Sequence, residues 1–95
     1  MYKIEFKPSV KKDLKHVQIS DIAFIHDSLN EFIHNFSSSY EILLMQKGII
    51  KKLKGEGDNI YRLKLRRYRV IYKKYEDILV ILVLRVSTRE GAYKK

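Results

Sequence analysis

The stretch IYRLKLRRYRVIYK, residues 60–73, constrains the fold more than any other part of the chain. If Arg66 and Arg67 form a two-residue turn, the flanking residues pair as antiparallel strands with Lys64 opposite Arg69. Successive strand residues then alternate between two faces. The apolar face carries Tyr61, Leu63, Leu65, Tyr68, Val70 and Tyr72, and the other carries Arg62, Lys64, Arg69 and Ile71. Because like charges side by side repel, the second face implies an anionic ligand.

The charge distribution along the chain supports this interpretation. The net charge is +9, yet residues 1–47 contain six Lys and six Asp or Glu. Residues 48–95 contain fourteen Lys or Arg and five Asp or Glu, so the whole excess lies in the half with the hairpin. Such an asymmetry indicates nucleic acid, an anionic membrane surface or an acidic protein as the partner.

Length and residue types exclude several classes of protein. A chain of 95 residues fits one domain, residues 1–95. There is no cysteine, and the three histidines have no carboxylate at metal-ligand spacing, so we expect no disulfide, metal or cofactor. The longest apolar run, residues 78–84, is far short of the ~20 residues that span a bilayer. We therefore expect no membrane contact and a cytoplasmic location.

The N-terminal half reads as a strand followed by helices. Residues 2–6 alternate like a strand, and Pro8, which lacks an amide donor, ends it and suits a first helical turn. A short helix follows from about Ser9. A longer one, capped by Ser20, is predicted from an apolar stripe at helical spacing. The stripe consists of Ile22, Ile25, Leu29, Phe32, Ile33 and Phe36.

The C-terminal half reads mainly as strands. Residues 40–46 fit one or two helical turns, and residues 49–53 fit a strand or an extended segment. A loop at 55–59 precedes the hairpin, and Glu76-Asp77 forms a turn before residues 78–86, an apolar run expected to be the central strand. The order β-α-α-β-β-β predicts an α+β fold, a small, largely antiparallel twisted sheet with the N-terminal helices packed on one face.

Basic residues from separate stretches should meet on such a sheet. Besides the hairpin cations, we expect RNA or ribosome contacts from Lys52, Lys54, Arg66, Arg67 and Arg85. RNA also brings its own nucleophile, the 2′-OH. Lys64 is the candidate general base, since nearby cations should lower its pKa, and Arg69 would stabilise charge on the phosphate. Plain phosphate binding without catalysis remains open from the residues alone.

The chain also resembles a known family. The segments IEFKPSVKKDLK, KKLKG, YRLKLRRYRVIY, ILVILVLRV and REGAY are similar to the RelE/ParE superfamily of bacterial and archaeal toxins, specifically to its RelE-like ribosome-dependent mRNA endonucleases. The resemblance implies that Lys64, with Arg62, activates the 2′-OH and that Arg69 steadies the phosphate. It further implies that Arg89 assists the leaving 5′ oxygen and that Tyr93 stacks on a base.

The resemblance also implies partners and an alternative activity. Toxins of this type bind an antitoxin, for which a +9 protein suits an acidic, helix-forming segment. The ribosome and mRNA would be the targets. The alternatives are a ParE-like DNA gyrase inhibitor without nuclease activity and a catalytically inactive RNA-binding relative.

Two positions depart from the family pattern. Relatives often have Gly at the hairpin turn, where Arg66-Arg67 stands here, so a longer or different turn would shift the register. Relatives also often have His before the last Arg, where this chain has Thr88. The acid role would then fall to Arg89 or to water.

Overall fold

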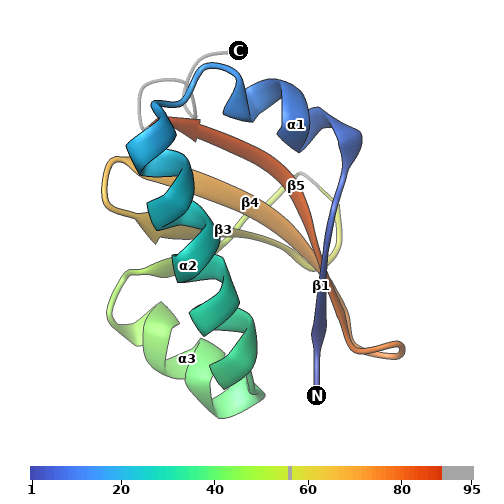
Figure 1. Cartoon of the computed structure of the whole chain (residues 1–95). Coiled ribbons are helices and arrows are strands. Elements are labelled where there is room, and N and C mark those ends of the chain that lie inside the picture. The colour runs from blue at the N-terminus through green and yellow to red at the C-terminus, as the bar shows by residue number, and fades with distance from the viewer. Residues whose placement is uncertain (56, 89–95) are drawn as a thin grey trace.

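The computed structural model describes residues 1–55 and 57–88 and folds them into three helices and a single sheet (Figure 1). The elements in chain order are β1 (Lys3–Phe6), α1 (Pro8–Leu14), α2 (Ile19–Asn35), α3 (Ser38–Gln46), β2 (Ile50–Lys52), β3 (Ile60–Leu65), β4 (Tyr68–Tyr75) and β5 (Val80–Thr88). The strand order is β1-β5-β4-β3-β2, and only β1 and β5 run parallel. The predicted α+β fold with a largely antiparallel sheet is confirmed.

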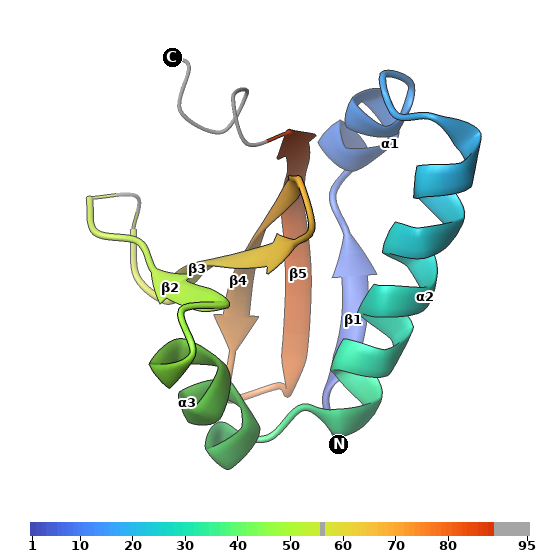
Figure 2. The ribbon, with the colours of Figure 1, turned by 90° about the vertical axis from the view of Figure 1, so that its left-hand side faces the viewer.

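The helices cover one face of this sheet. Figure 2 shows α2 along the β1 side and α3 next to β2. Apolar side chains from the helices, among them Ile25, Leu29 and Phe32, are buried against Leu63 and Val83 of the sheet. Among the described residues, no helix has the length and apolar character needed to cross a bilayer.

The β3–β4 hairpin has the register that its sequence predicts. Lys64 lies opposite Arg69 and Tyr61 opposite Tyr72, with Arg66 and Arg67 between the strands. The two-residue turn therefore forms without glycine, and the register shift considered for it does not occur. On the apolar face, the side chain of Tyr72 is fully buried and its ring stacks on Tyr61 with centroids 5.3 Å apart.

The first helices largely match the prediction, with one wrong cap. Pro8 occupies the first turn of α1, as expected. Helix α2 begins at Ile19 and its N-cap is Gln18, because the carbonyl of Gln18 accepts from the amides of Asp21 and Ile22. Ser20 is therefore inside the first turn, and its predicted role as the cap was wrong.

The ambiguous middle of the chain forms a helix and a strand. The side chain of Ser37 accepts a hydrogen bond from the amide of Tyr40 at 3.1 Å, so Ser37 caps α3. The chain then turns back, and the three residues of β2 pair antiparallel to β3, with Ile50 opposite Leu63. The predicted helical turns at 40–46 and the predicted strand at 49–53 are thus both confirmed.

The prediction that the apolar run at 78–86 forms the central strand was wrong. Strand β5 lies second from one edge, and β4 is the middle strand because the short β2 adds a fifth strand beyond β3. The register between β4 and β5 also shifts, since Ile71 lies opposite Arg85 but Tyr72 lies opposite Val83. This bulge returns Val86 to the core face after Val83.

A buried polar cluster joins α3 to the sheet. The Glu41 carboxylate accepts from Tyr72 Oη at 2.7 Å and from Lys74 Nζ at 2.5 Å. Burial raises the pKa of Tyr72, and the charge and hydrogen bond of Glu41 raise it further. Burial alone would lower the pKa of Lys74, but the hydrogen bond and charge of Glu41 outweigh it and raise the pKa. Lys74 therefore stays charged and neutralises Glu41.

Replacing Lys74 with methionine should destabilise the fold. Lys74→Met keeps most of the apolar length of the side chain but leaves a buried carboxylate without its cation, which typically costs about 3 kcal/mol of unfolding free energy. Adding Glu41→Gln removes that charge and should recover at least half of the loss. Urea denaturation of both variants measures this. A Lys74→Met protein as stable as the wild type would contradict it.

Candidate nucleic-acid interface

The sheet face opposite the helices gathers cations from three strands. Facing residues in neighbouring strands share a face. Lys51 of β2 lies opposite Arg62 of β3, and Lys64 of β3 lies opposite Arg69 of β4. We call these four residues, Lys51, Arg62, Lys64 and Arg69, the cationic face. Three of them were predicted from the sequence to share a face, and the register confirms that they do.

Arg69 is the buried member of the cationic face. Only 5% of it is exposed, and its Nη1 donates to the carbonyls of Arg66 and Tyr68, each at 3.0 Å. Its Nε is buried and has no hydrogen-bond partner among the described residues, and within 1–55 and 57–88 no carboxylate pairs with it. A buried charge without a counter-ion is costly. This position therefore favours an incoming anion.

Lys64 differs from Arg69 in its exposure. It lies directly across from Arg69 but is open to solvent, and it takes part in none of the ion pairs of the described residues. An exposed ammonium group beside a fixed guanidinium suits a polyanion that approaches from solvent. Its predicted role as a general base stays a prediction.

Two of the predicted RNA-contacting lysines lie away from the cationic face. Lys52 is opposite Tyr61, so it is on the helix side of the sheet, with its Nζ 6.0 Å from the centre of the Tyr61 ring. Lys54 is exposed in the loop after β2. The residue that joins the cationic face is instead Lys51, which sequence reasoning missed because the register of β2 was not known.

The hairpin turn is held by helix α2. Arg66 has a left-handed backbone with φ of 55°, which costs roughly 1–2 kcal/mol for a residue with a Cβ. Its guanidinium carbon lies 3.8 Å from the centre of the Phe24 ring, and Arg67 Nη2 donates to Asp21 Oδ2 at 2.9 Å. Tyr68 Oη donates to the same oxygen at 2.6 Å. We call this set of contacts the turn clamp.

The turn clamp also positions the buried arginine, because the carbonyl of Arg66 accepts from Arg69. The guanidinium groups of Arg66 and Arg67 point to α2 rather than to the cationic face. Hydrogen bonds with Tyr68 and then Asp21 raise the pKa of Arg67. The predicted RNA contacts of Arg66 and Arg67 stay predictions, and both residues have a structural role.

Arg85 forms an ion pair with helix α1. Its Nε and Nη2 donate to the two oxygens of Asp13, each at 2.9 Å, and the amide of Val86 donates to Asp13 Oδ2 at 2.8 Å. The hydrogen bonds and charge of Asp13 raise the pKa of Arg85. Its guanidinium already has a two-point anionic partner, so a contact with RNA would have to compete with Asp13.

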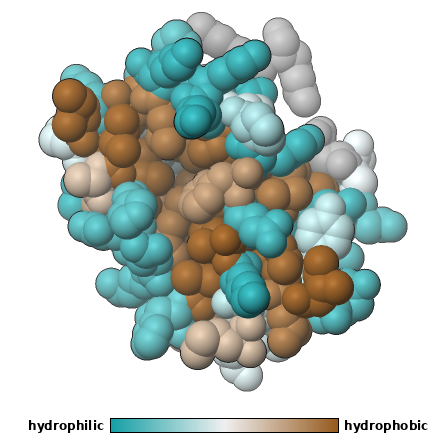
Figure 3. All heavy atoms as spheres, turned by 45° about the vertical axis from the view of Figure 1, so that its right-hand side comes forward, coloured by the Kyte–Doolittle hydropathy of each residue, from teal (hydrophilic) through white to brown (hydrophobic). Residues whose placement is uncertain are grey.

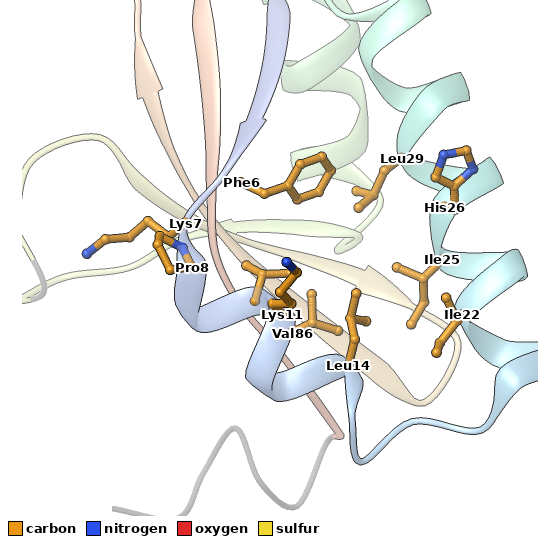
Figure 4. Close-up of a pocket in the computed structure, with 11 residues that line it drawn as sticks. Phe6, Lys7, Pro8, Lys11, Leu14, Ile22, Ile25, His26, Leu29 and Val86 are labelled. Atoms are coloured by element: carbon orange, nitrogen blue, oxygen red, sulfur yellow. The ribbon is translucent and has the colours of Figure 1, made fainter.

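A second feature lies on the helix side, where α1 and α2 leave a groove of about 500 Å³ between them. Figure 3 shows apolar residues over much of the visible face of the molecule, with hydrophilic residues around and among them. Apolar side chains point into the groove, and Lys7 and His26 lie at its margins (Figure 4). The groove is lined by Phe6, Lys7, Pro8, Val10, Lys11, Leu14, Ile22, Ile25, His26, Leu29 and Val86.

Comparison with known proteins identifies the family. The family described as "ParE toxin of type II toxin-antitoxin system, parDE" matches residues 4–93. The chain belongs to the RelE/ParE superfamily of toxins. It is also 32% identical over 93 residues to RelE1 of Methanocaldococcus jannaschii, covering 98% of this chain and 96% of RelE1.

Solved structures of RelE–RelB complexes share the fold of this toxin. The archaeal complex from Pyrococcus horikoshii OT3 matches with a TM-score of 0.67 and 27% identity, over 93% of this chain and 94% of that one. The complex from Methanococcus jannaschii matches with a TM-score of 0.67 and 26% identity, over 95% of each chain. This is a toxin of a type II toxin–antitoxin system.

Of the five catalytic residues expected for the toxin, the structure brings three together. Arg62, Lys64 and Arg69 share the cationic face. Arg89 and Tyr93 lie outside the described residues. The turn clamp had no counterpart in the sequence reasoning, because Asp21 and Phe24 lie more than forty residues from the turn. The one sequence feature that pointed to this contact was the helical spacing of the apolar residues in α2, which places Asp21 beside the buried stripe.

The turn clamp predicts a pH dependence of stability. The hydrogen bond from Tyr68, and after it Arg67, holds the pKa of Asp21 below its usual 3.8. A depressed pKa means that the contribution of Asp21 to stability is present above pH 3.8 and is lost as the pH falls through the folded-state pKa. Asp21→Asn should therefore lower the melting temperature at neutral pH and flatten its decline in acid.

Thermal melts followed by circular dichroism over a pH series measure this difference. Asp27→Asn is the matched control, since Asp27 is 83% exposed and contacts only His26, at 3.6 Å, among the ion pairs of the described residues. If melting temperature falls with pH in the same way for the wild type and Asp21→Asn, the turn clamp does not contribute to stability.

Proposed function

We propose that this toxin is a ribosome-dependent mRNA endonuclease. The cut would follow attack of an RNA 2′-oxygen on the adjacent phosphorus, with departure of the 5′-oxygen of the next nucleotide. The products are a 2′,3′-cyclic phosphate and a 5′-hydroxyl. No metal is required, because the substrate supplies the nucleophile and the protein supplies the proton acceptor and the positive charge.

The observation that carries this proposal is the pair formed by Lys64 and Arg69. They face each other across β3 and β4, where Cβ atoms are ~4.5–5.5 Å apart, so both can reach one phosphodiester. Arg69 is held by backbone carbonyls and keeps its Nε without a partner in the described residues. A donor that is already fixed loses little entropy when charge develops on the phosphate.

Each residue of the pair then has a separate role. Lys64 would accept the 2′-OH proton, with Arg62 two residues away on the same strand face raising the local positive potential. Arg69 would bind the non-bridging oxygens of the phosphate. By family resemblance, Arg89 would assist the leaving 5′-oxygen and Tyr93 would stack on a base. A ribosomal target places the protein in the cytoplasm.

The second candidate is a ParE-like inhibitor of DNA gyrase without nuclease activity. It is favoured by the family model that matches residues 4–93, which is described as a ParE toxin. The curated relative and the two solved complexes carry RelE names instead. A gyrase supercoiling assay separates the two, since the endonuclease leaves supercoiling unchanged. A relative that binds RNA without cutting it would be inactive in both assays.

The cleavage reaction should depend on Lys64. With translating ribosomes and mRNA, Lys64→Ala should lower the cleavage rate about 100-fold or more, the usual contribution of a general base. Lys52→Ala is the matched control, because it removes the same charge from an exposed lysine on the opposite face of the sheet. Primer extension on the mRNA measures the rate.

The outcomes of this experiment separate the alternatives. Equal losses in Lys64→Ala and Lys52→Ala would contradict the assigned roles and leave only a general effect of charge. No cleavage by the wild type would remove the nuclease function, and inhibition of supercoiling would then favour the gyrase target. Both variants change exposed residues, so their folding is checked by their melting temperatures.

The α1–α2 groove is the proposed docking site for the cognate antitoxin. Most of its lining is apolar, with Lys7 at its margin and Lys11 among the lining residues, so it suits an amphipathic helix with an apolar stripe and acidic flanks. The net charge of +9 attracts such a segment over a longer range. The solved complexes with 26% and 27% identity are complexes of RelE with RelB, which supports an antitoxin as the partner.

A charge placed in the groove should weaken antitoxin binding. Phe6 lines the groove and is 50% exposed, so Phe6→Glu should reduce affinity for the antitoxin encoded beside the toxin by about 30-fold or more, as for an interface anchor. Ile19→Glu is the control, because Ile19 is 87% exposed and does not line the groove. Calorimetric titration compares them, and equal affinities would place the antitoxin elsewhere.

A further inference from the structure

We propose that Lys51 binds a second phosphate of the RNA, beyond the phosphate at Arg69. This inference rests on the proposed function and extends it from one phosphate to a track along the sheet. The track runs across β4, β3 and β2, from Arg69 through Lys64 and Arg62 to Lys51. The site would therefore recognise an extended RNA strand rather than a single nucleotide.

The register of the sheet gives the track its length. Arg69 and Lys51 are two strands apart, which is about 10 Å across the sheet, and the step from Lys64 to Arg62 adds about 7 Å along β3. The backbones of the two ends are thus about 12 Å apart, and the carbonyls of Arg66 and Tyr68 hold the Arg69 guanidinium at the turn, the end of the hairpin away from Lys51. Successive phosphates of one strand fit this arrangement.

Lys51 is also available for such a contact. It is exposed, and it belongs to none of the ion pairs among residues 1–55 and 57–88. It lies directly opposite Arg62, so its side chain leaves the sheet on the same face as Arg62 and continues the row of cations to the edge strand.

Lysine on an edge strand has a second explanation, which the chain itself allows to be tested. Edge lysines discourage pairing with another sheet, and β2 is an edge strand. Lys51 and Lys52 are neighbours in β2 and both are exposed, so they serve that role equally. Only Lys51 faces the track, since Lys52 is opposite Tyr61 on the helix side.

The experiment compares Lys51→Ala, Lys51→Arg and Lys52→Ala in the full chain. Ribosomes are programmed with an mRNA that carries a 2′-O-methyl group at the A-site codon, so that toxin binds without cutting. Affinity is measured at increasing NaCl concentration. Lys51→Ala should weaken binding about two- to fivefold and reduce the slope of log affinity against log salt by about 0.7, the value for one phosphate of a single strand.

The controls make the outcome specific. Lys52→Ala should keep the wild-type affinity and slope, and Lys51→Arg should keep the slope because it keeps the charge. On unmodified mRNA, Lys51→Ala should raise KM and leave kcat unchanged, since the contact is made before and during the reaction alike. Equal effects of Lys51→Ala and Lys52→Ala, or a slope that Lys51→Ala does not change, would overturn the inference.

A second arm identifies which RNA supplies the phosphate. Ribosomes are prepared with an mRNA that ends after the P-site codon. If the effect of Lys51→Ala disappears there, the phosphate is in the mRNA, and if it persists, the phosphate is in ribosomal RNA. The first result supports a track along one RNA strand, and the second overturns that track, because the phosphate at Lys51 would then belong to another strand than the one at Arg69. Failure of the proposed function can be told apart from failure of this inference, because binding and its dependence on Lys51 are measured without cleavage. A wild-type protein that does not bind the ribosomes would overturn both the proposed function and the inference.

Discussion

The whole site depends on the alternation of side chains between the two faces of the β3–β4 hairpin and on the register that the turn imposes. A slip of one residue would exchange the two faces, placing Arg62 and Lys64 against the core and Tyr72 in solvent. The apolar face opposes such a slip because its side chains would lose their burial in the core. The turn clamp opposes it at the turn between β3 and β4. Arg66 adopts its left-handed backbone without glycine because its side chain contacts Phe24, which offsets part of the backbone cost.

The structure divides the cations of the C-terminal half into two groups. The first group has carboxylate partners and joins elements that lie far apart in the sequence. It comprises Lys74 with Glu41 of α3, Arg67 with Asp21 of α2, and Arg85 with Asp13 of α1. Each helix is thus tied to the sheet by one ion pair, and the pKa of each cation is raised.

The second group has no carboxylate partner in the described residues and lies on one face. Lys51, Lys64 and Arg69 belong to it. Three acidic residues of the N-terminal half, Asp13, Asp21 and Glu41, therefore neutralise cations that join the helices to the sheet. No carboxylate of the described residues neutralises Lys51, Lys64 or Arg69 in this way.

Features of this toxin that depend on neighbouring residues were easier to predict than features that depend on contacts between distant residues. The hairpin followed from alternation and a two-residue turn, and α2 followed from its apolar stripe, because both signals lie within a few turns of chain. The features that the sequence did not reveal needed tertiary information. Lys51 was not singled out because the face of a three-residue strand is set by its pairing with β3, and Glu41 was overlooked because its partners are more than thirty residues away.

The fold by itself does not choose between an RNA target and gyrase, because one fold can carry either function. A surface that only adheres to a partner has no need of a buried cation, since exposed charges bind with less desolvation. Arg69 is buried, is oriented by two carbonyls and keeps Nε without a partner among the described residues. Such a group is useful where charge develops during a reaction, because folding has already fixed its orientation and it need not reorient in the transition state. Its burial therefore favours a phosphate undergoing chemistry over a surface that is merely bound.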